Sequence, residues 1–203
     1  LRETKKSGNR DSLVTAYLNL GNLNLKQNGA SRDYEKSKNF FEKALSQIDS
    51  SDIKTRALCF EKLGDCARYS ASTLAAIKNY DKAFEYYFTL KNFDKLGLML
   101  HRKGDCILDQ KNYALAKKNY LKAIEYYQKN NNVNKIASCT SNIWEIYMKQ
   151  GQSKLALKQF QKAYHIVEDL EMRSYIQFEI GKMYIDSLHL PNRDSLFINS
   201  LNH

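Results

Sequence analysis

Residues 111–129 read KNYALAKKNYLKAIEYYQK, and their pattern of small and aromatic residues returns along most of the chain. Ala116, Tyr120 and Ala123 are spaced four and three residues apart, so they share one stripe of an α-helix. The same small, aromatic, small set stands forty residues earlier and forty residues later, at Ala76, Tyr80 and Ala83 and at Ala156, Phe160 and Ala163. The chain is therefore predicted to be built from helical repeats.

In most repeats the helix that precedes this set carries a small residue at a fixed position. We number each repeat so that this residue is position 8 and the last alanine of the set is position 27. Position 8 is then a glycine in repeats one, two, three and five, namely Gly21, Gly64, Gly104 and Gly181. In repeat four it is Trp144. The pattern predicts one all-α solenoid over residues 1–203, with repeats at about 12–50, 55–91, 96–130, 135–168 and 173–203.

The first residues of the chain resemble a link between repeats. Residues 8–13 (GNRDSL) match the links at 91–96 (KNFDKL) and 131–136 (NNVNKI). We therefore expect a turn at 8–13, with the end of a preceding helix before it. The same match suggests that the sequence is an excerpt of a longer protein.

Composition agrees with helices joined by short turns. Of 203 residues, 43% are hydrophobic, and one proline and eight glycines are few for a sheet-rich or disordered chain. No run of about 18 apolar residues occurs, and residues 1–10 lack the apolar stretch of a secretion signal. We expect a cytoplasmic protein in which Cys59, Cys66, Cys106 and Cys139 are packing residues in a reducing compartment.

These motifs resemble the tetratricopeptide repeat over nearly the whole chain. The features that carry the resemblance are Leu-Gly on the first helix and Ala-x-x-x-Tyr-x-x-Ala on the second. The period of about 40 resembles the long-repeat subgroup found in kinesin light chains, spindle-orientation scaffolds and membrane-fusion attachment proteins. The resemblance implies a right-handed superhelix of about five helix pairs, in which glycine at position 8 lets paired helices approach and the aromatic at position 24 fills the remaining space.

No arrangement of residues predicts catalysis. The chain lacks a glycine-rich phosphate loop, HExxH and Gly-x-Ser-x-Gly. None of its four histidines has another histidine or a cysteine three or four residues away, as a helical metal site prefers. We expect no enzyme activity, no cofactor, no metal and no small-molecule substrate.

The first helices are predicted to carry the ligand-binding face. Positions 2, 6, 9 and 13 point away from the packed face at 100° per residue, and they would line a concave groove for an extended peptide or a partner helix. Inward asparagine amides can hold a peptide backbone, and charged neighbours can select its side chains. The candidate groove residues are Asn19, Asn22, Lys62, Asp65, Arg102, Asp105, Asn142, Glu145 and Lys182. Alternatively, Lys62 with Asp105 and Arg102 with Glu145 are pairs that join neighbouring repeats.

The net charge of +10 gathers on the second helices. Lysines at positions 22 and 26 are predicted to form a basic outer face of Lys78, Lys82, Lys118, Lys122, Lys158 and Lys162. They are either a solvated surface or a contact for anionic membrane or nucleic acid.

Three functions remain open at this point. The leading one is a protein-interaction scaffold or adaptor. The others are a membrane or nucleic-acid contact through the basic outer face, and a regulatory or sensor segment of a larger enzyme or transcription factor.

Overall fold

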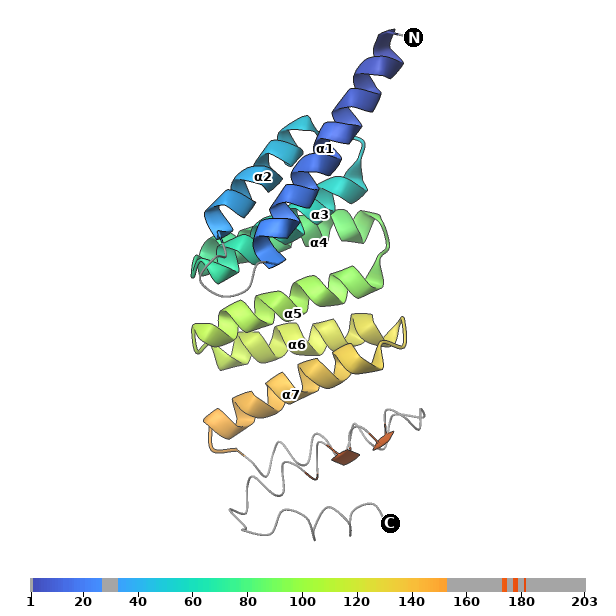
Figure 1. The fold of residues 1–203 in the computed structure, drawn as a ribbon. Helices are drawn as coiled ribbons and strands as arrows, with labels where there is room; N and C mark the ends of the chain where they lie inside the picture. The colour runs from blue at the N-terminus through green and yellow to red at the C-terminus, as the bar shows by residue number, and fades with distance from the viewer. Residues whose placement is uncertain (1, 27–32, 153–172, 175–176, 179–180, 182–203) are drawn as a thin grey trace. The chain divides into compact units, whose positions relative to one another are not determined.

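The computed structural model describes residues 2–26, 33–152, 173–174, 177–178 and 181. These residues form helices joined by short turns, with no strand among them (Figure 1), so the predicted all-α fold is confirmed. The helices are α1 (Arg2–Lys26), α2 (Tyr34–Gln47), α3 (Ile53–Tyr69), α4 (Thr73–Thr89), α5 (Phe93–Asp109), α6 (Tyr113–Gln128) and α7 (Val133–Lys149). The chain divides into two compact units, Leu1–Asn119 and Tyr120–His203, and each is described by itself.

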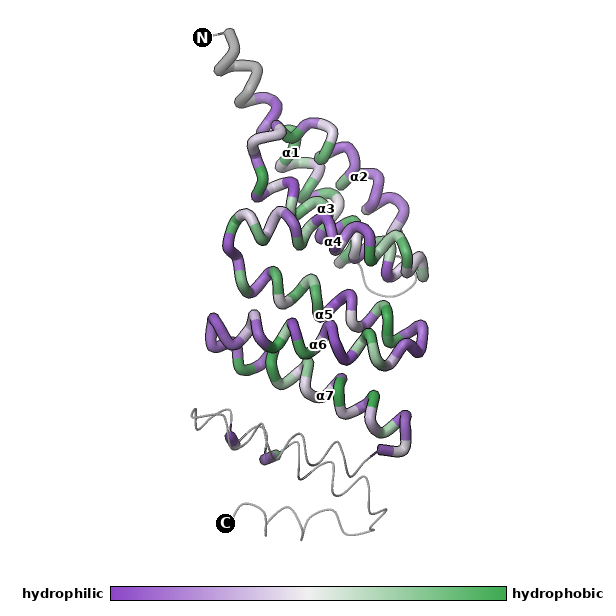
Figure 2. The backbone as a smooth tube through the Cα atoms, turned by 180° about the vertical axis from the view of Figure 1, so that it is seen from behind, coloured by the Kyte–Doolittle hydropathy of each residue, from purple (hydrophilic) through white to green (hydrophobic). Residues whose placement is uncertain are grey.

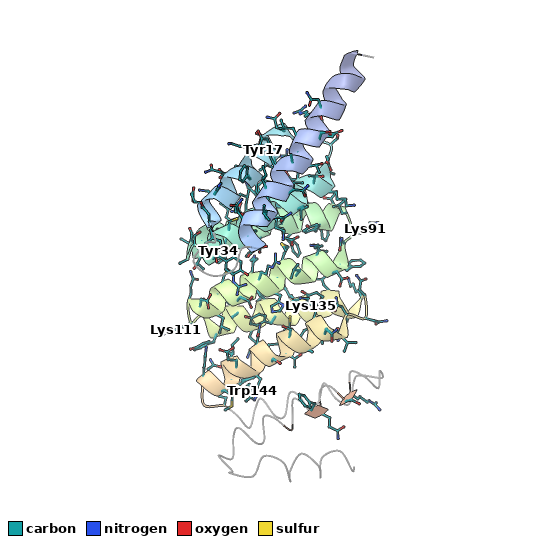
Figure 3. The ribbon with its side chains drawn as sticks, in the orientation of Figure 1. Tyr17, Tyr34, Lys91, Lys111, Lys135 and Trp144 are labelled. Atoms are coloured by element: carbon teal, nitrogen blue, oxygen red, sulfur yellow. The ribbon has the colours of Figure 1, made fainter. Side chains whose placement is uncertain are left out.

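The three turns between α3 and α6 are each made by three residues, of which the middle one has a positive φ, and the four-residue turn between α6 and α7 has its positive φ at Asn131. Lys91 (φ 51°) between α4 and α5 and Lys111 (φ 60°) between α5 and α6 are examples (Figure 3). The next residue serves two helices at once. The backbone N–H of Asn92 donates to the Tyr87 carbonyl at 3.1 Å, closing α4, while its side chain accepts from the Lys95 N–H, also at 3.1 Å, and caps α5. Such turns are too short for anything but antiparallel neighbouring helices.

The glycine at position 8 lies directly against the aromatic ring at position 24. A Cβ built on Gly21 would stand 2.7 Å from Phe41 Cε1, and one built on Gly64 would stand 2.5 Å from Tyr80 Cδ1. Both rings are fully buried. The predicted role of the glycine in close helix packing is confirmed in the first two repeats.

The core of each unit follows the small and aromatic stripe. In the first unit the alanines of this stripe are inaccessible to solvent: Ala44, Ala76, Ala83 and Ala116. In the second unit Tyr120, Ala123 and Tyr127 are buried to 1% exposure or less. All four cysteines are buried and in the thiol form, as expected of packing residues. Figure 2 shows that hydrophobic and hydrophilic residues alternate along the helices.

The beginning of the chain differs from the prediction. No turn forms at 8–13, because α1 continues unbroken from Arg2 to Lys26. Residues 8–13 keep their helical hydrogen bonds in this single helix, and a turn there would break several of them. Sequence similarity to a link is therefore not sufficient for a turn.

Some predictions lie outside the described residues. They include most of residues 153–203, and with them the second helix of the fourth repeat, the fifth repeat, Lys158, Lys162 and Lys182. Trp144 is half-buried on α7, but the helix expected to pair with it lies in that part of the chain. None of the described helices is long and apolar enough to span a membrane.

Candidate functional site

The candidate groove residues lie on the first helices, and their exposure differs. Asn19 on α1 is exposed and Asn22 is half-buried. Lys62 on α3 is half-buried, whereas Asp65 is buried, with 8% of its surface exposed. The others in described residues are half-buried: Arg102 and Asp105 on α5 in the first unit, and Asn142 and Glu145 on α7 in the second.

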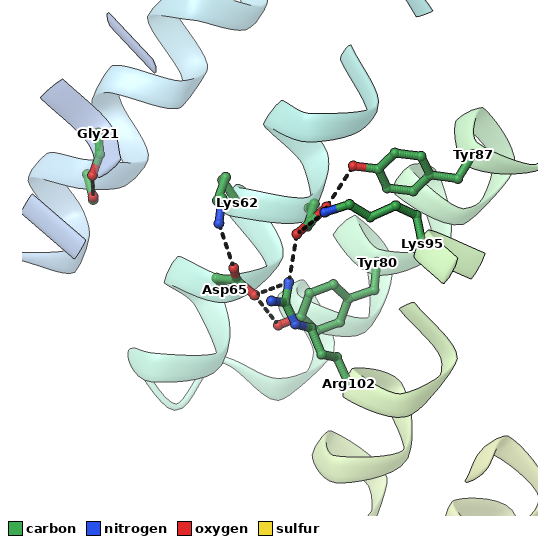
Figure 4. A network of polar contacts seen from close by, with 9 residues as sticks. Gly21, Lys62, Asp65, Tyr80, Tyr87, Lys95 and Arg102 are labelled. Atoms are coloured by element: carbon green, nitrogen blue, oxygen red, sulfur yellow. Dashed lines mark hydrogen bonds and ion pairs between the residues drawn. The ribbon is translucent and has the colours of Figure 1, made fainter. Parts of the chain in front are cut away.

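A charged network in the first unit joins α3, α4 and α5 (Figure 4). Its centre is Glu61, which lies at position 5 of α3 with 2% of its surface exposed. The Glu61 carboxylate accepts a 2.6 Å hydrogen bond from the Tyr87 hydroxyl, and it lies 2.9 Å from Lys95 Nζ and 3.2 Å from Arg102 Nη1. One buried carboxylate therefore holds three donors from two following helices.

Asp65, one turn further along α3, shares the same arginine. Arg102 Nη1 lies 2.8 Å from Asp65 Oδ1, which also accepts a 3.0 Å hydrogen bond from the Tyr80 hydroxyl. Lys62 Nζ lies 3.7 Å from the other carboxylate oxygen. Arg102 thus connects both carboxylates of α3 to α5 (Figure 4).

These ion pairs differ from the expected ones. Arg102, at position 6 of its repeat, pairs with Glu61 and Asp65 at positions 5 and 9 of the preceding repeat. Lys62 pairs within its own helix, and Asp105 pairs with Arg68 of α3 at 3.2 Å. In the second unit Glu145 lies 2.6 Å from Lys149 of α7.

The balance of burial and nearby charge shifts the pKa values of Glu61 and Asp65 in opposite directions. Burial by itself raises the pKa of Glu61, but the hydrogen bonds from Tyr87 and Lys95 and the positive charges outweigh it, so the pKa falls below 4.5. Burial raises the pKa of Asp65 above 3.8, and the charge of Arg102 only partly opposes it. Burial also acts on Arg102, but both carboxylates outweigh it and raise the pKa of its guanidinium. Arg102 is therefore charged at any physiological pH.

The network is built to hold repeats together. Its acids and bases already bind one another, so Asp65 and Arg102 have little capacity left for a ligand. Sequence reasoning omitted Glu61, Tyr87 and Lys95. A signal was available for Glu61, because it stands three residues before Gly64 and so lies beside the packed face of α3.

A part of the first unit remains open to solvent. Tyr69, at position 13 of α3, is 54% exposed, and its ring stacks on Tyr34 of α2 with centroids 5.3 Å apart and planes at 16°. Asn19, Asn22 and Lys62 occupy further inward positions of α1 and α3 that solvent reaches. The basic outer face is also accessible at its described members, Lys78, Lys82, Lys118 and Lys122. Within the described residues, no group of three acidic, histidine or cysteine side chains is arranged to hold a metal ion.

Comparison with known proteins gives structural matches only. No sequence-family profile matches the chain, and no curated protein sequence does. BtubC (BKLC) from P. vanneervenii is similar at a TM-score of 0.68 and 15% identity, over 95% of this chain and 80% of that one. The apo form of RapI is similar at a TM-score of 0.69 and 16% identity, over 92% of this chain and 68% of that one.

A third similar structure has repeats of the predicted kind. It is a putative kinesin light chain from Podosopora anserina with nearly identical TPR-like repeats, at a TM-score of 0.62 and 9% identity, and the match covers 95% of this chain and 93% of that one. At sequence identities this low, the structural similarity shows a shared fold and does not show a shared function. The helix pairs, the glycine-on-aromatic packing and these matches together show that the chain has an all-α fold of helical repeats, similar to that of proteins with TPR-like repeats.

Proposed function

We propose that the protein is an interaction scaffold that binds an extended peptide or a partner's helix along its first helices. The observation that supports this most directly is the accessible polar and aromatic set at the inward positions of α1 and α3: Asn19, Asn22, Lys62 and Tyr69. An asparagine amide donates and accepts hydrogen bonds at once, which suits the backbone of an extended peptide. An exposed tyrosine ring offers apolar area at a low entropic cost.

The charged network supports this proposal by giving the binding face a fixed frame. Arg102 and Lys95 of α5 are tied to Glu61 of α3, so α3, which carries Lys62 and Tyr69, is held in place against the next first helix. A preorganised face loses less entropy when it binds a ligand. Asn19, Asn22 and Tyr69 are thus proposed as ligand contacts outside this network, whereas Lys62 also pairs with Asp65 at 3.7 Å.

The test separates these two groups. A displayed peptide library is selected on the 203-residue protein, and affinity for a recovered peptide is measured with the Asn19→Ala/Asn22→Ala double variant. Asn39→Ala, a change on the exposed side of α2, is the matched control. We expect at least a tenfold loss of affinity for the double variant, an unchanged melting temperature, and no loss for the control. Equal affinities of all three proteins would contradict binding on this face.

A second candidate function rests on the basic outer face. Lys78, Lys82 and Lys118 are exposed on the second helices of the first unit, and Lys122 is exposed in the second unit. Binding of an anionic membrane or nucleic acid there would weaken steeply with salt, since it depends on exposed charges. Replacing the four lysines with glutamate should then abolish binding to phosphatidylserine vesicles or to single-stranded DNA. If the same variant still binds the selected peptide, the peptide binds on the first helices.

A further inference from the structure

Tyr69 is an exposed aromatic residue at an inward position of α3. It is 54% exposed, and its ring stacks on Tyr34 of α2 with centroids 5.3 Å apart and planes at 16°. The counterparts of Tyr69 at position 13 of α1, α5 and α7 are charged residues, namely Lys26, Asp109 and Lys149. The tyrosine pair is therefore an apolar surface that the packing of the repeats does not require.

The accessible polar groups on the inward side of α1 and α3 donate more hydrogen bonds than they accept. The side-chain amides of Asn19 and Asn22 can do both, and neither is bonded to another described residue. The Lys62 ammonium only donates, and at 3.7 Å from Asp65 it has N–H groups left for a ligand (Figure 4). Arg68, whose side chain is 32% exposed, likewise only donates. A ligand on this side must therefore supply mainly acceptors.

Both carboxylates of α3 are already occupied, so they add no acceptors. Glu61 and Asp65 each bind Arg102 and a tyrosine hydroxyl. The charges of the network and its neighbours also balance. Four cations and four carboxylates lie in the network or next to it: Lys62, Arg68, Lys95, Arg102, Glu61, Asp65, Asp105 and Asp109. Net charge therefore selects neither an acidic nor a basic ligand, and neutral carbonyl groups are the acceptors that fit.

A proline-rich peptide supplies such acceptors with few donors. Each proline lacks a backbone N–H, and a run of prolines forms a polyproline II helix whose carbonyls are not bonded within the helix. A peptide in a β conformation would instead bring one N–H group per residue, and the accessible side chains offer few acceptors for them. Proline-rich segments also dock on surfaces lined by aromatic rings, which Tyr69 and Tyr34 provide here.

The spacing of the groups on α3 matches this conformation. Lys62 and Tyr69 are seven residues apart, so they lie on the same side of the helix, about 10.5 Å from each other along its axis. One turn of polyproline II has three residues and is about 9.3 Å long. Groups one turn apart on such a peptide can therefore lie opposite the Lys62 ammonium and the Tyr69 ring.

We propose that the peptide bound on the first helices is proline-rich and lies along α3 in the polyproline II conformation. One proline ring packs on Tyr69, and backbone carbonyls accept hydrogen bonds from Lys62 and from the Asn19 and Asn22 amides. This inference rests on the proposed function and adds the class of the ligand. Because a polyproline II segment is already extended before it binds, it loses little conformational entropy on this face.

Isothermal titration calorimetry with a ten-residue oligoproline tests the ligand class, with a ten-residue glycine-serine peptide as the reference. The oligoproline should bind at least tenfold more tightly than the reference. Tyr69→Ala should weaken oligoproline binding at least tenfold, whereas Tyr69→Phe keeps the ring and should bind like the unchanged protein. Phe88→Ala, which removes a 62% exposed ring from α4, is the matched control and should leave the affinity unchanged.

The Asn19→Ala/Asn22→Ala variant separates this inference from the proposed function. If the oligoproline binds no better than the reference while a selected library peptide depends on these asparagines, the face binds peptides and the proline-rich class is overturned. Oligoproline binding that is unchanged in Tyr69→Ala would also overturn it. If no selected peptide depends on the asparagines, the proposed function fails, and this inference fails with it.

Discussion

Replacing Arg102 with methionine removes the one side chain that joins both buried carboxylates of α3 to α5. Methionine keeps much of the length and volume of arginine, so the change acts mainly on charge. Glu61 would keep Lys95 and Tyr87, and Asp65 would keep only the Tyr80 hydroxyl and Lys62 at 3.7 Å. Two carboxylates would then lie close together with less positive charge between them.

The structure gives the size of the effect. At the observed separations of 2.8 Å and 3.2 Å, Coulomb's law with an effective dielectric of about 20 gives attractions of about 6 and 5 kcal/mol. Desolvation of the guanidinium, which is 22% exposed, costs several kcal/mol and is relieved in the variant. The expected net loss in the free energy of unfolding is about 3–5 kcal/mol.

The assay is urea unfolding at pH 7, followed by circular dichroism. Lys103→Met is the matched control, because Lys103 is the next residue on α5 and pairs with Asp81, whose side chain is 49% exposed. The Lys103 side chain is 18% exposed, but solvent reaches Asp81 and screens the pair, so we expect this pair to contribute about 1 kcal/mol. If Arg102→Met were no less stable than Lys103→Met, the network would not hold α3 to α5.

Three further predictions follow from the buried groups. The pKa of Glu61 is lowered in the folded protein, so its charge contributes stability above pH 4.5, and this stability is lost as the pH falls through the pKa of the folded state. The loss of unfolding free energy caused by Glu61→Gln should therefore be largest at neutral pH and shrink below pH 4.5. A loss that does not depend on pH would refute this. Gly64→Ala should lower stability, because the clash of the added Cβ with the buried Tyr80 ring costs about 1–3 kcal/mol and exceeds the helix-propensity gain of about 1 kcal/mol. A rise in the melting temperature would show that the ring moves aside. Burial raises the pKa of Cys59 and Cys66 to about 12 and that of Cys106 to about 11, so a disulfide reagent at pH 8 should modify these thiols only in denaturant; rapid labelling of the native protein would be the contrary result.

Periodicity was sufficient to predict the fold. Small residues facing aromatic rings at a fixed spacing have one good helical solution, and Gly64 against Tyr80 shows it. The turn expected at 8–13 failed because a turn between helices gains its stability from packing on both sides, and local sequence does not report that packing. The repeating stripe of small and aromatic residues correctly predicted which residues are buried. The resemblance of residues 8–13 to a link between repeats did not predict where a helix ends.

The candidate site was predicted less well, because helical angle alone does not determine burial. Asp65 is on the predicted inward side of α3, but it is also next to the packed face, and the Tyr80 hydroxyl draws it into the core. Glu61 was not among the predicted site residues, because position 5 is not one of the inward positions; in the structure three donors from α4 and α5 satisfy its carboxylate. The partners of a buried charge come from distant parts of the sequence, and only the folded chain shows them.

Hydrogen–deuterium exchange of the protein with a selected peptide bound tests the central claim most directly, since it locates the ligand without mutation. Binding along the first helices predicts new protection in the segments of α1 and α3 that contain Asn19, Asn22, Lys62 and Tyr69, with exchange in α4 unchanged. Protection confined to the segment of α4 that contains Lys78 and Lys82 would place the ligand on the basic outer face and contradict the account.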